Sequence, residues 1–508
     1  MVFRRPLSIC LVSKLSHYFS LKELRVYRVL VLMLTFFVYL TYHMSRRSLS
    51  IVKPALNHKN CSDILPDMYD SNNTDIDEHW CDWAPFSSRT MLGTLDLVFL
   101  ISYSVSMYIN GMIAERMNLR YFLTIGMLFS GICNILFGLA YFLGIHSLGY
   151  FYFVQIITGI GQSTGWPGVL AAVGNWFGSS KRGLMFGIWN SHLYFGNIAG
   201  AAIAGLFVDD KWGMSFIVPG IIIAGTGILV FLFLVQKPEE VSLSLNSNAE
   251  QTPVKANDKL KTQIQFSSSS DVESDQLNNH KAISIIDALK IPGVIEFSIC
   301  LFFAKLVSYT FLDWLPLYIV SSNEGISSSK SAYMTIVFDV GGIAGGIIAG
   351  YLADRTGASA LCCIVMLIFA IPSLGIYRLY GNTSEVVNEI LQFIAGIFVN
   401  APYALITTAV SAELGSKVPS KSAMATVSAI IDATGSIGSA VGPSLAGFVS
   451  EYDWNYVFIV VMLSDLCALL VLIRVGYNDI KQLIFKWRTH RTRNSNSMNQ
   501  DIISVTTY

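Results

Sequence analysis

The chain has 508 residues, of which 53% are apolar and 13% charged, with a mean hydropathy of +0.52. Soluble domains carry roughly 25% charged residues, so this composition excludes a soluble protein built from several domains. The 34 basic and 34 acidic residues cancel, which leaves no overall field that would attract nucleic acid. About twelve spans of roughly 20 residues would use the apolar content. The composition therefore predicts a multi-pass membrane protein.

Twelve apolar runs follow one another along the chain. The first six lie near 29–50, 92–113, 121–143, 149–172, 183–207 and 214–236. The second six lie near 294–320, 331–352, 359–379, 388–411, 422–448 and 455–475. A polar stretch rich in Ser, Asn, Asp and Lys separates the two sets and cannot bury a core of its own. We predict the following organisation: an N-terminal segment at 1–28, a six-helix half at 29–236, a flexible linker at 237–290, a second six-helix half at 291–475, and a polar tail at 476–508.

Basic residues in the connections predict the orientation. Arg and Lys gather in the N-terminal segment, the linker and the tail, and cytoplasmic loops carry such an excess. We therefore expect both termini to be cytoplasmic and the loop at about 51–91 to face the lumen or the exterior. Asn60 and Asn72 in this loop begin glycosylation sequons. Cys61 and Cys81 lie in the same loop, where an oxidising environment permits a disulfide, and two free thiols are the alternative.

A short pattern ending in an acid and an arginine follows the second run and returns after the eighth. The residues are Gly111, Glu115 and Arg116, then Gly350, Asp354 and Arg355. An acid and an arginine at a helix end can interact with the terminus of a neighbouring helix, so we interpret the pattern as a gating element. Two parallel repeats with a substrate site between them are typical of secondary transporters.

This Gly-x-x-x-acid-Arg pattern resembles the loop motif of the major facilitator superfamily. Longer segments, among them YHMSRRSLSIVKPAL and FAKLVSYTFLDWLPLYI, resemble the organophosphate:phosphate antiporter family and, within it, the animal glucose-6-phosphate exchangers of the type 2 and type 1 group. The resemblance implies an all-α major facilitator fold with twelve transmembrane helices. It also implies exchange of a sugar phosphate for inorganic phosphate across the endoplasmic reticulum membrane.

The first run carries a polar stripe. Tyr39, Tyr42 and Arg46 are spaced by three and four residues, so they share one face of a helix. A guanidinium in this setting can bind phosphate through two parallel hydrogen bonds, although Arg46 and Arg47 could merely place their charges at the outer end of the span. The resemblance matches Arg46 to the arginine that contacts phosphate in the exchangers. Arg47 stands where a lysine is usual, and we predict that Arg46, Arg47, Tyr39 and Tyr42 contact the substrate.

Lys305 lies near the middle of the seventh run, where a charge costs at least about 2.5–3.5 kcal/mol and indicates function. Tyr309 and Asp313 follow at intervals of four residues and share its helix face. Two hypotheses stay open: Lys305 binds the substrate phosphate, or Asp313 neutralises Lys305 through Tyr309. Bacterial organophosphate exchangers have an arginine where this chain has Ser308, so Lys305 is a candidate for the second cation.

Two further residues in apolar runs have alternative interpretations. His192 lies one residue before the position of a histidine in a bacterial glycerol-3-phosphate carrier, so it is either a ligand or a hydrogen-bonded packing residue. Asp339 could carry a proton, but a hydrogen bond to a neighbouring helix is the commoner use.

Three classes of function remain. We expect an exchanger of glucose 6-phosphate or a related sugar phosphate for inorganic phosphate. The alternatives are a proton-coupled organic-anion symporter that uses Asp339 or Asp313, and a membrane receptor or scaffold that transports nothing. No nucleotide-binding loop occurs in the sequence. We therefore expect no enzyme, no cofactor, no metal and no nucleic-acid partner.

Overall fold

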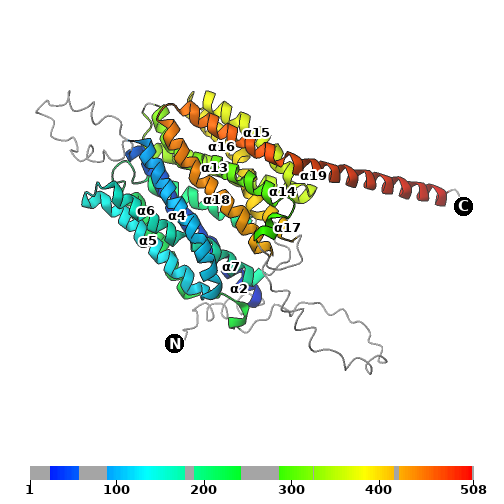
Figure 1. Ribbon diagram of the computed structural model, residues 1–508, viewed down its shortest axis with the longest axis horizontal. Helices are drawn as coiled ribbons and strands as arrows, with labels where there is room; N and C mark the ends of the chain where they lie inside the picture. The colour runs from blue at the N-terminus through cyan, green and yellow to red at the C-terminus, as the bar shows by residue number, and fades with distance from the viewer. Residues whose placement is uncertain are drawn as a thin grey trace, which may run out of the picture.

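The computed structural model describes residues 23–56, 88–177, 188–241, 285–323, 325–416 and 423–505, which form helices and no strand. Two groups of helices lie side by side (Figure 1). We call them the N-half, from α2 to α10, and the C-half, from α13 to α19. The predicted linker lies largely within 242–284, outside the described residues, as does most of the predicted lumenal loop, 57–87.

The helices of the N-half correspond to the first six apolar runs. Their bounds are α2 Glu23–Leu56, α4 Arg89–Arg116, α5 Leu119–Leu143, α6 Leu148–Gln162, α7 Gly165–Phe177, α9 His192–Gly205 and α10 Met214–Phe233. The fourth run is split into α6 and α7 at Ser163 and Thr164. Local signals set the ends of α5, because the Asn118 side chain accepts from the Arg120 N–H and Gly144 takes the left-handed conformation at φ 60°.

The helices of the C-half correspond to the second six runs. Their bounds are α13 Val294–Ser322, α14 Ser328–Thr356, α15 Ser359–Tyr380, α16 Glu385–Leu405, α17 Ser411–Ser416, α18 Ala423–Ser450 and α19 Trp454–Val505. A π-helical turn, η4 Ile406–Val410, joins α16 to α17. Two short elements lie between the halves: η2 Pro238–Val241 and α12 Ile285–Leu289. Nine helical segments of the described chain are long and apolar enough to cross a membrane.

The last helix extends far beyond the apolar run that predicts it. The run ends near residue 475, whereas α19 continues to Val505 and projects from the bundle (Figure 1). Apolarity determines which part of a helix can lie in lipid, but not where the helix ends. A helix can continue into water because its backbone hydrogen bonds are satisfied within the segment.

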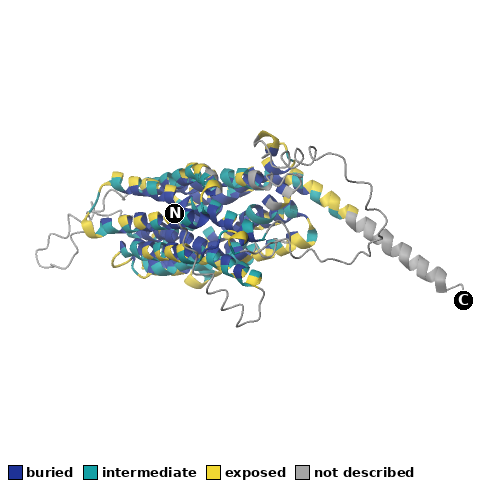
Figure 2. Ribbon diagram, turned by 90° about the horizontal axis from the view of Figure 1, so that it is seen from below, coloured by how far each residue is buried: buried dark blue, intermediate teal, exposed yellow. Residues whose placement is uncertain are grey.

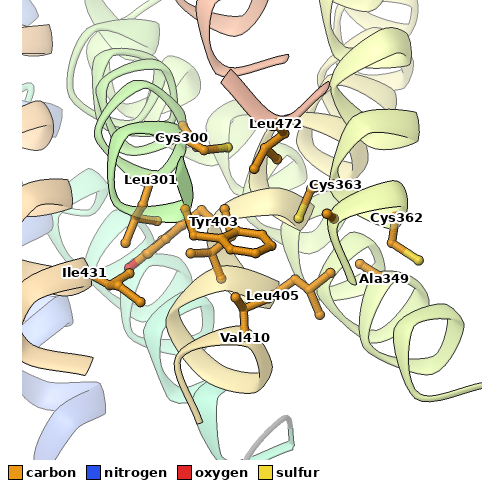
Figure 3. Packing of buried hydrophobic residues seen from close by; sticks show 14 of the residues in the cluster. Cys300, Leu301, Ala349, Cys362, Cys363, Tyr403, Leu405, Val410, Ile431 and Leu472 are labelled. Atoms are coloured by element: carbon orange, nitrogen blue, oxygen red, sulfur yellow. The ribbon is translucent and has the colours of Figure 1, made fainter. Parts of the chain in front are cut away.

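Buried side chains occupy the middle of the helix bundle (Figure 2). In the C-half, Tyr403 packs in one cluster with Leu301, Leu405 and Cys300 (Figure 3). Small residues bring helices close together, as the glycine-rich runs predict. A Cβ at Gly200 on α9 would lie 2.5 Å from the Met44 carbonyl oxygen of α2, and a Cβ at Gly438 on α18 would lie 2.0 Å from the Phe302 carbonyl oxygen of α13.

The two halves make contact at one end of the bundle, where α4 begins and α18 ends. Arg89 of α4 donates to the Ser450 carbonyl oxygen at 2.5 Å, and the Glu451 carboxylate accepts from the Thr90 N–H at 2.8 Å. The guanidinium therefore lies at the C-terminus of α18 and the carboxylate at the N-terminus of α4. Both placements are electrostatically favourable, so these contacts close this end of the molecule.

Candidate functional site

Side chains of both halves line a cavity at their interface. The N-half contributes Tyr39, His43, Arg46, Leu100, Tyr103, Trp166, Asn190 and Leu193, and the C-half contributes Lys305, Tyr309, Tyr403, Thr407, Asp432, Ser436 and Ser439. We call this space the central cavity. Each half supplies one cation, because Arg46 comes from α2 and Lys305 from α13.

The guanidinium of Arg46 is hydrogen-bonded at Nε, whereas Nη2 has no hydrogen-bond partner among the described residues. Its Nε donates to Gln162 Oε1 at 2.6 Å, and Gln162 Nε2 donates to Ser45 Oγ at 3.0 Å. The guanidinium carbon lies 4.5 Å from the centre of the Tyr103 ring, a cation–π distance. Nη2 is buried and has no hydrogen-bond partner among the described residues. An anion in the central cavity can therefore accept from this guanidinium.

Lys305 forms an ion pair with Asp432, a carboxylate of another helix. Its Nζ donates to Asp432 Oδ1 of α18 at 2.8 Å, and the lysine is 5% exposed. The hypothesis that Asp313 neutralises Lys305 through Tyr309 is therefore wrong. Close packing brings the pair together: a Cβ at Gly435, one turn beyond Asp432, would lie 2.7 Å from Leu301 and 3.0 Å from Lys305 Cδ.

Arg47 connects the two halves beside the central cavity. It is 2% exposed, and its guanidinium donates to the Leu312 carbonyl oxygen of α13 and, at 3.1 Å, to Thr335 Oγ1 of α14. It lines a second, adjoining cavity together with Arg46, Asp96 and Asp313. The sequence predicts that Arg47 binds the substrate. In the structure its guanidinium instead forms hydrogen bonds across the interface of the halves.

Tyr42 and His192 do not line the central cavity, although the sequence predicts a substrate contact for Tyr42 and leaves His192 open between a ligand and a packing residue. The Tyr42 hydroxyl is hydrogen-bonded to Thr164 Oγ1 at 3.1 Å. The His192 ring packs with its centre 4.6 Å from that of Tyr39 and 4.5 Å from that of Trp189. Neither residue lines the central cavity or the two cavities beside it. Tyr39 and Tyr309, by contrast, do line the central cavity.

Several polar residues of the site are missed by the sequence-based prediction. Asp432 pairs with Lys305, and Asp96 pairs with Lys53, whose Nζ also donates to the Asp313 carbonyl oxygen at 3.1 Å. Both aspartates lie in apolar runs, where an ionisable residue is itself a signal of function. Gln162 gives no such signal, since its role depends on the break between α6 and α7.

The formal charges around these cavities balance in the described residues. Four cations face four carboxylates: Arg46, Arg47, Lys53 and Lys305 against Asp96, Asp313, Asp339 and Asp432. Asp339 accepts a hydrogen bond from Asn197 Nδ2 of α9 at 3.0 Å, which confirms the predicted bond to a neighbouring helix. Two of the carboxylates form ion pairs with lysines.

The loop-motif residues lie at exposed helix ends. A Cβ at Gly111 or Gly350 would meet nothing within 4 Å. Arg116, Asp354 and Arg355 are exposed, and Arg355 donates to the Tyr351 hydroxyl of its own helix at 3.0 Å. The side chain of Glu115 lies outside the described residues.

The features of the predicted lumenal loop are not part of the described structure. Asn60, Asn72, Cys61 and Cys81 fall within 57–87, outside the described residues. No group of His, Cys, Asp and Glu in the described ranges could hold a metal ion.

Two membrane-spanning helix groups that enclose a polar cavity, with one cation from each group, have the architecture of a membrane transporter. The model of the Major Facilitator Superfamily matches residues 35–425. The chain is 48% identical to "Glucose-6-phosphate exchanger SLC37A2" of Xenopus laevis, covering 90% of this chain and 94% of the relative. It is 45% identical to the Homo sapiens protein of that name, covering 92% and 95%, and 42% identical to "Glucose-6-phosphate exchanger SLC37A1" of Homo sapiens, covering 89% and 93%.

A solved structure supports the fold independently. A bacterial homologue of the human lysosomal transporter Spinster, in an inward-facing and unoccupied conformation, matches with a TM-score of 0.58 at 15% identity, covering 90% of this chain and 97% of that chain. The chain therefore belongs to the major facilitator superfamily and, within it, to the family of the glucose-6-phosphate exchangers.

Proposed function

We propose that this chain is an antiporter that exchanges a sugar phosphate, glucose 6-phosphate in the first place, for inorganic phosphate by alternating access. The observation that supports this most strongly is the placement of Arg46 and Lys305 in one cavity between the halves. The relatives are named glucose-6-phosphate exchangers, which supports a sugar phosphate as the substrate. Catalysis and a cofactor play no part in the proposal.

The central cavity suits a phosphate group chemically. Arg46 offers an unpartnered guanidinium nitrogen, and Lys305 Nζ can turn from Asp432 toward a bound anion. Both cations donate charge-assisted hydrogen bonds to oxyanions. Aromatic and hydroxyl side chains such as Tyr309, Tyr403 and Thr407 line the remaining wall and can contact a sugar ring.

The charges of the cavity favour exchange over reorientation of the empty carrier. Without an anion, Arg46 presents a buried donor with no partner, which is costly. Lys305 is paired with Asp432 within the C-half, whereas Arg46 belongs to the N-half. An anion that binds both cations therefore bridges the halves and lowers the cost of bringing them together. The carrier is then expected to reorient mainly in the loaded state.

Proteoliposomes test the proposed function. Purified protein in vesicles loaded with unlabelled phosphate should take up labelled phosphate, and external glucose 6-phosphate should compete. Empty vesicles and vesicles loaded with sulfate should take up much less. Uptake that requires a pH gradient instead of internal phosphate would indicate the symporter, and the absence of uptake would indicate a receptor or scaffold.

Location, orientation and modification are part of the same proposal. The excess of basic residues in the N-terminal segment and in the tail supports cytoplasmic termini, and the resemblance to the exchangers supports the endoplasmic reticulum membrane. We further propose glycans at Asn60 and Asn72 and a disulfide between Cys61 and Cys81. Glycosidase should shift the mobility of the wild type and leave an Asn60→Gln/Asn72→Gln variant unchanged. Thiol labelling of Cys61 or Cys81 without prior reduction would exclude the disulfide.

A further inference from the structure

Asp339 of α14 has a buried carboxylate oxygen without a partner. Oδ1 accepts from Asn197 Nδ2 at 3.0 Å, whereas Oδ2 has no hydrogen-bond partner among the described residues. The residue is 1% exposed. A buried carboxylate that lacks a donor is costly when ionised, and a proton on that oxygen removes the charge. Asp339 is therefore suited to bind a proton.

Two of the other carboxylates around the cavities are bonded directly to a cation. Asp96 and Asp432 each pair directly with a lysine, and Asp313 lies in the fields of both Lys53 and Arg47. Asp339 also lies in the field of Arg47, but the guanidinium directs its hydrogen bonds to Ser50, Leu312 and Thr335. Asp339 thus receives electrostatic support from a cation without a bond to it.

Ionisable groups of four helices line the same cavity as Asp339 or lie in its field. They are Arg47 and His43 of α2, Tyr194 of α9, Tyr309 of α13, and Tyr403 of α16, and Asp313 of α13 lies with Asp339 in the field of Arg47. Arg47 is the permanent cation of this set. Arg47 is therefore the cation that stabilises the ionised form of Asp339.

An anion in the central cavity would destabilise the ionised form of Asp339. Asp339 lines a cavity that shares His43, Tyr309 and Tyr403 with the central cavity. The eight charges described above sum to zero when all four carboxylates are ionised, so a bound phosphate adds negative charge that no remaining cation offsets. Like charges at close range favour the protonated form of a carboxyl group.

Resting on the proposed function, we propose that Asp339 takes up one proton from water when an anion binds in the central cavity and releases it when the anion leaves. The carboxylate becomes a carboxylic acid, so the loaded carrier moves each bound anion, sugar phosphate or inorganic phosphate, together with a proton on the protein. Because both exchanged anions bind in this way, the proton shuttles with the carrier and exchange needs no pH gradient.

Infrared difference spectroscopy tests the proposal on the full-length protein. Inorganic phosphate added to the wild type should produce a carbonyl band of a protonated carboxylic acid. Asp339→Asn should lack this band, since the amide can still accept from Asn197 but cannot take up a proton. Asp465→Asn is the matched control, because Asp465 is a buried aspartate of α19 that lines neither the central cavity nor the two cavities beside it, and this variant should keep the band.

Calorimetry of phosphate binding in buffers of different ionisation enthalpy provides the second measurement. The wild type should take up about one proton more than Asp339→Asn, and its affinity should fall about tenfold more per pH unit above the pH at which Asp339 titrates. The variant should bind phosphate more tightly than the wild type at high pH. If phosphate exchange occurs without the band, or if the band persists in Asp339→Asn, the proton site is refuted while the exchanger stands. If the wild type does not bind phosphate, the proposed function itself fails.

Discussion

The pair of Lys305 and Asp432 links the stability of the C-half to anion binding, so its neutralisation separates the two roles of Lys305. The atoms Nζ and Oδ1 lie 2.8 Å apart, with side chains 6% and 21% exposed. Removing one partner of a buried ion pair costs about 3–5 kcal/mol, because the other charge stays buried without compensation. Because Asp432 keeps some contact with water, Lys305→Ala should lie near the lower end of this range and Asp432→Asn near the upper end.

Anion affinity should move in opposite directions in the two single variants. In Asp432→Asn the ammonium of Lys305 has no internal counter-ion, so phosphate no longer competes with a carboxylate and should bind at least about tenfold more tightly, or about 1.4 kcal/mol. In Lys305→Ala one of the two cations is lost. A contact between opposite charges near a protein surface is worth about 4 kcal/mol at 4 Å. Asp432 already offsets about half of this, so we expect a loss of roughly 2 kcal/mol, or about 30-fold.

The double variant completes the cycle. Replacing both charges removes the pair without leaving an uncompensated charge, so thermal stability should return to within about 1 kcal/mol of the wild type. Anion affinity should stay low, since the cation is still absent. Thermal unfolding with and without phosphate, together with titration calorimetry, measures both quantities on the same samples.

Two results would refute this reasoning. If Asp432→Asn binds phosphate no more tightly than the wild type, then phosphate does not compete for Lys305. If Lys305→Ala exchanges phosphate normally, then Arg46 alone suffices and the ion pair serves only the packing of α13 against α18.

Three further variants test other parts of the structure. Arg46→Lys keeps the charge but loses the planar fork, so phosphate affinity measured by calorimetry should fall by about 1.5–3 kcal/mol, or roughly 10- to 150-fold; unchanged affinity would show that Arg46 does not bind phosphate. Hydrogen bonds, the largest being that from Ser88, hold the pKa of Glu451 below its ordinary value of 4.5, so its contribution to the closed end is present above that pH and is lost as the pH falls through the lowered pKa. Thermal stability of the wild type should fall as this carboxylate is protonated in acid, whereas Glu451→Gln should lack that part of the pH dependence; equal pH dependence would exclude the role of Glu451. Gly438→Ala should destabilise the protein by about 1–3 kcal/mol through overpacking against α13, whereas Gly225→Ala, whose Cβ meets nothing within 4 Å, should be neutral or slightly stabilising in thermal unfolding.

Much of the architecture can be predicted from the sequence because lipid imposes a simple constraint. A segment in the bilayer must satisfy its own backbone hydrogen bonds, so each long apolar run becomes a helix. The repeated Gly-x-x-x-acid-Arg pattern and the resemblance to known exchangers then predict the fold, which the comparisons confirm. Arg46 and Lys305 can also be recognised, because a cation in an apolar run needs a specific reason to be there.

The partners of these cations could not be predicted in the same way. Lys305 and Asp432 are 127 positions apart, and Arg46 and Gln162 are 116 apart. Periodicity along one helix identifies Asp313 as a neighbour of Lys305 on the same face, but it carries no information about the rotation of α18 against α13. Likewise, Arg47 follows Arg46 directly in the sequence and bonds across the interface of the halves.

The reason is geometric. Consecutive residues of a helix point about 100° apart, so only the packing of neighbouring helices decides whether a polar side chain faces a cavity, another helix or lipid. That packing depends on close approaches at residues such as Gly435 and Gly438, which join segments far apart in the chain. The sequence alone therefore determined the helices and the charges within them, whereas the tertiary structure decided which charges neutralise each other and which one is left for an anion.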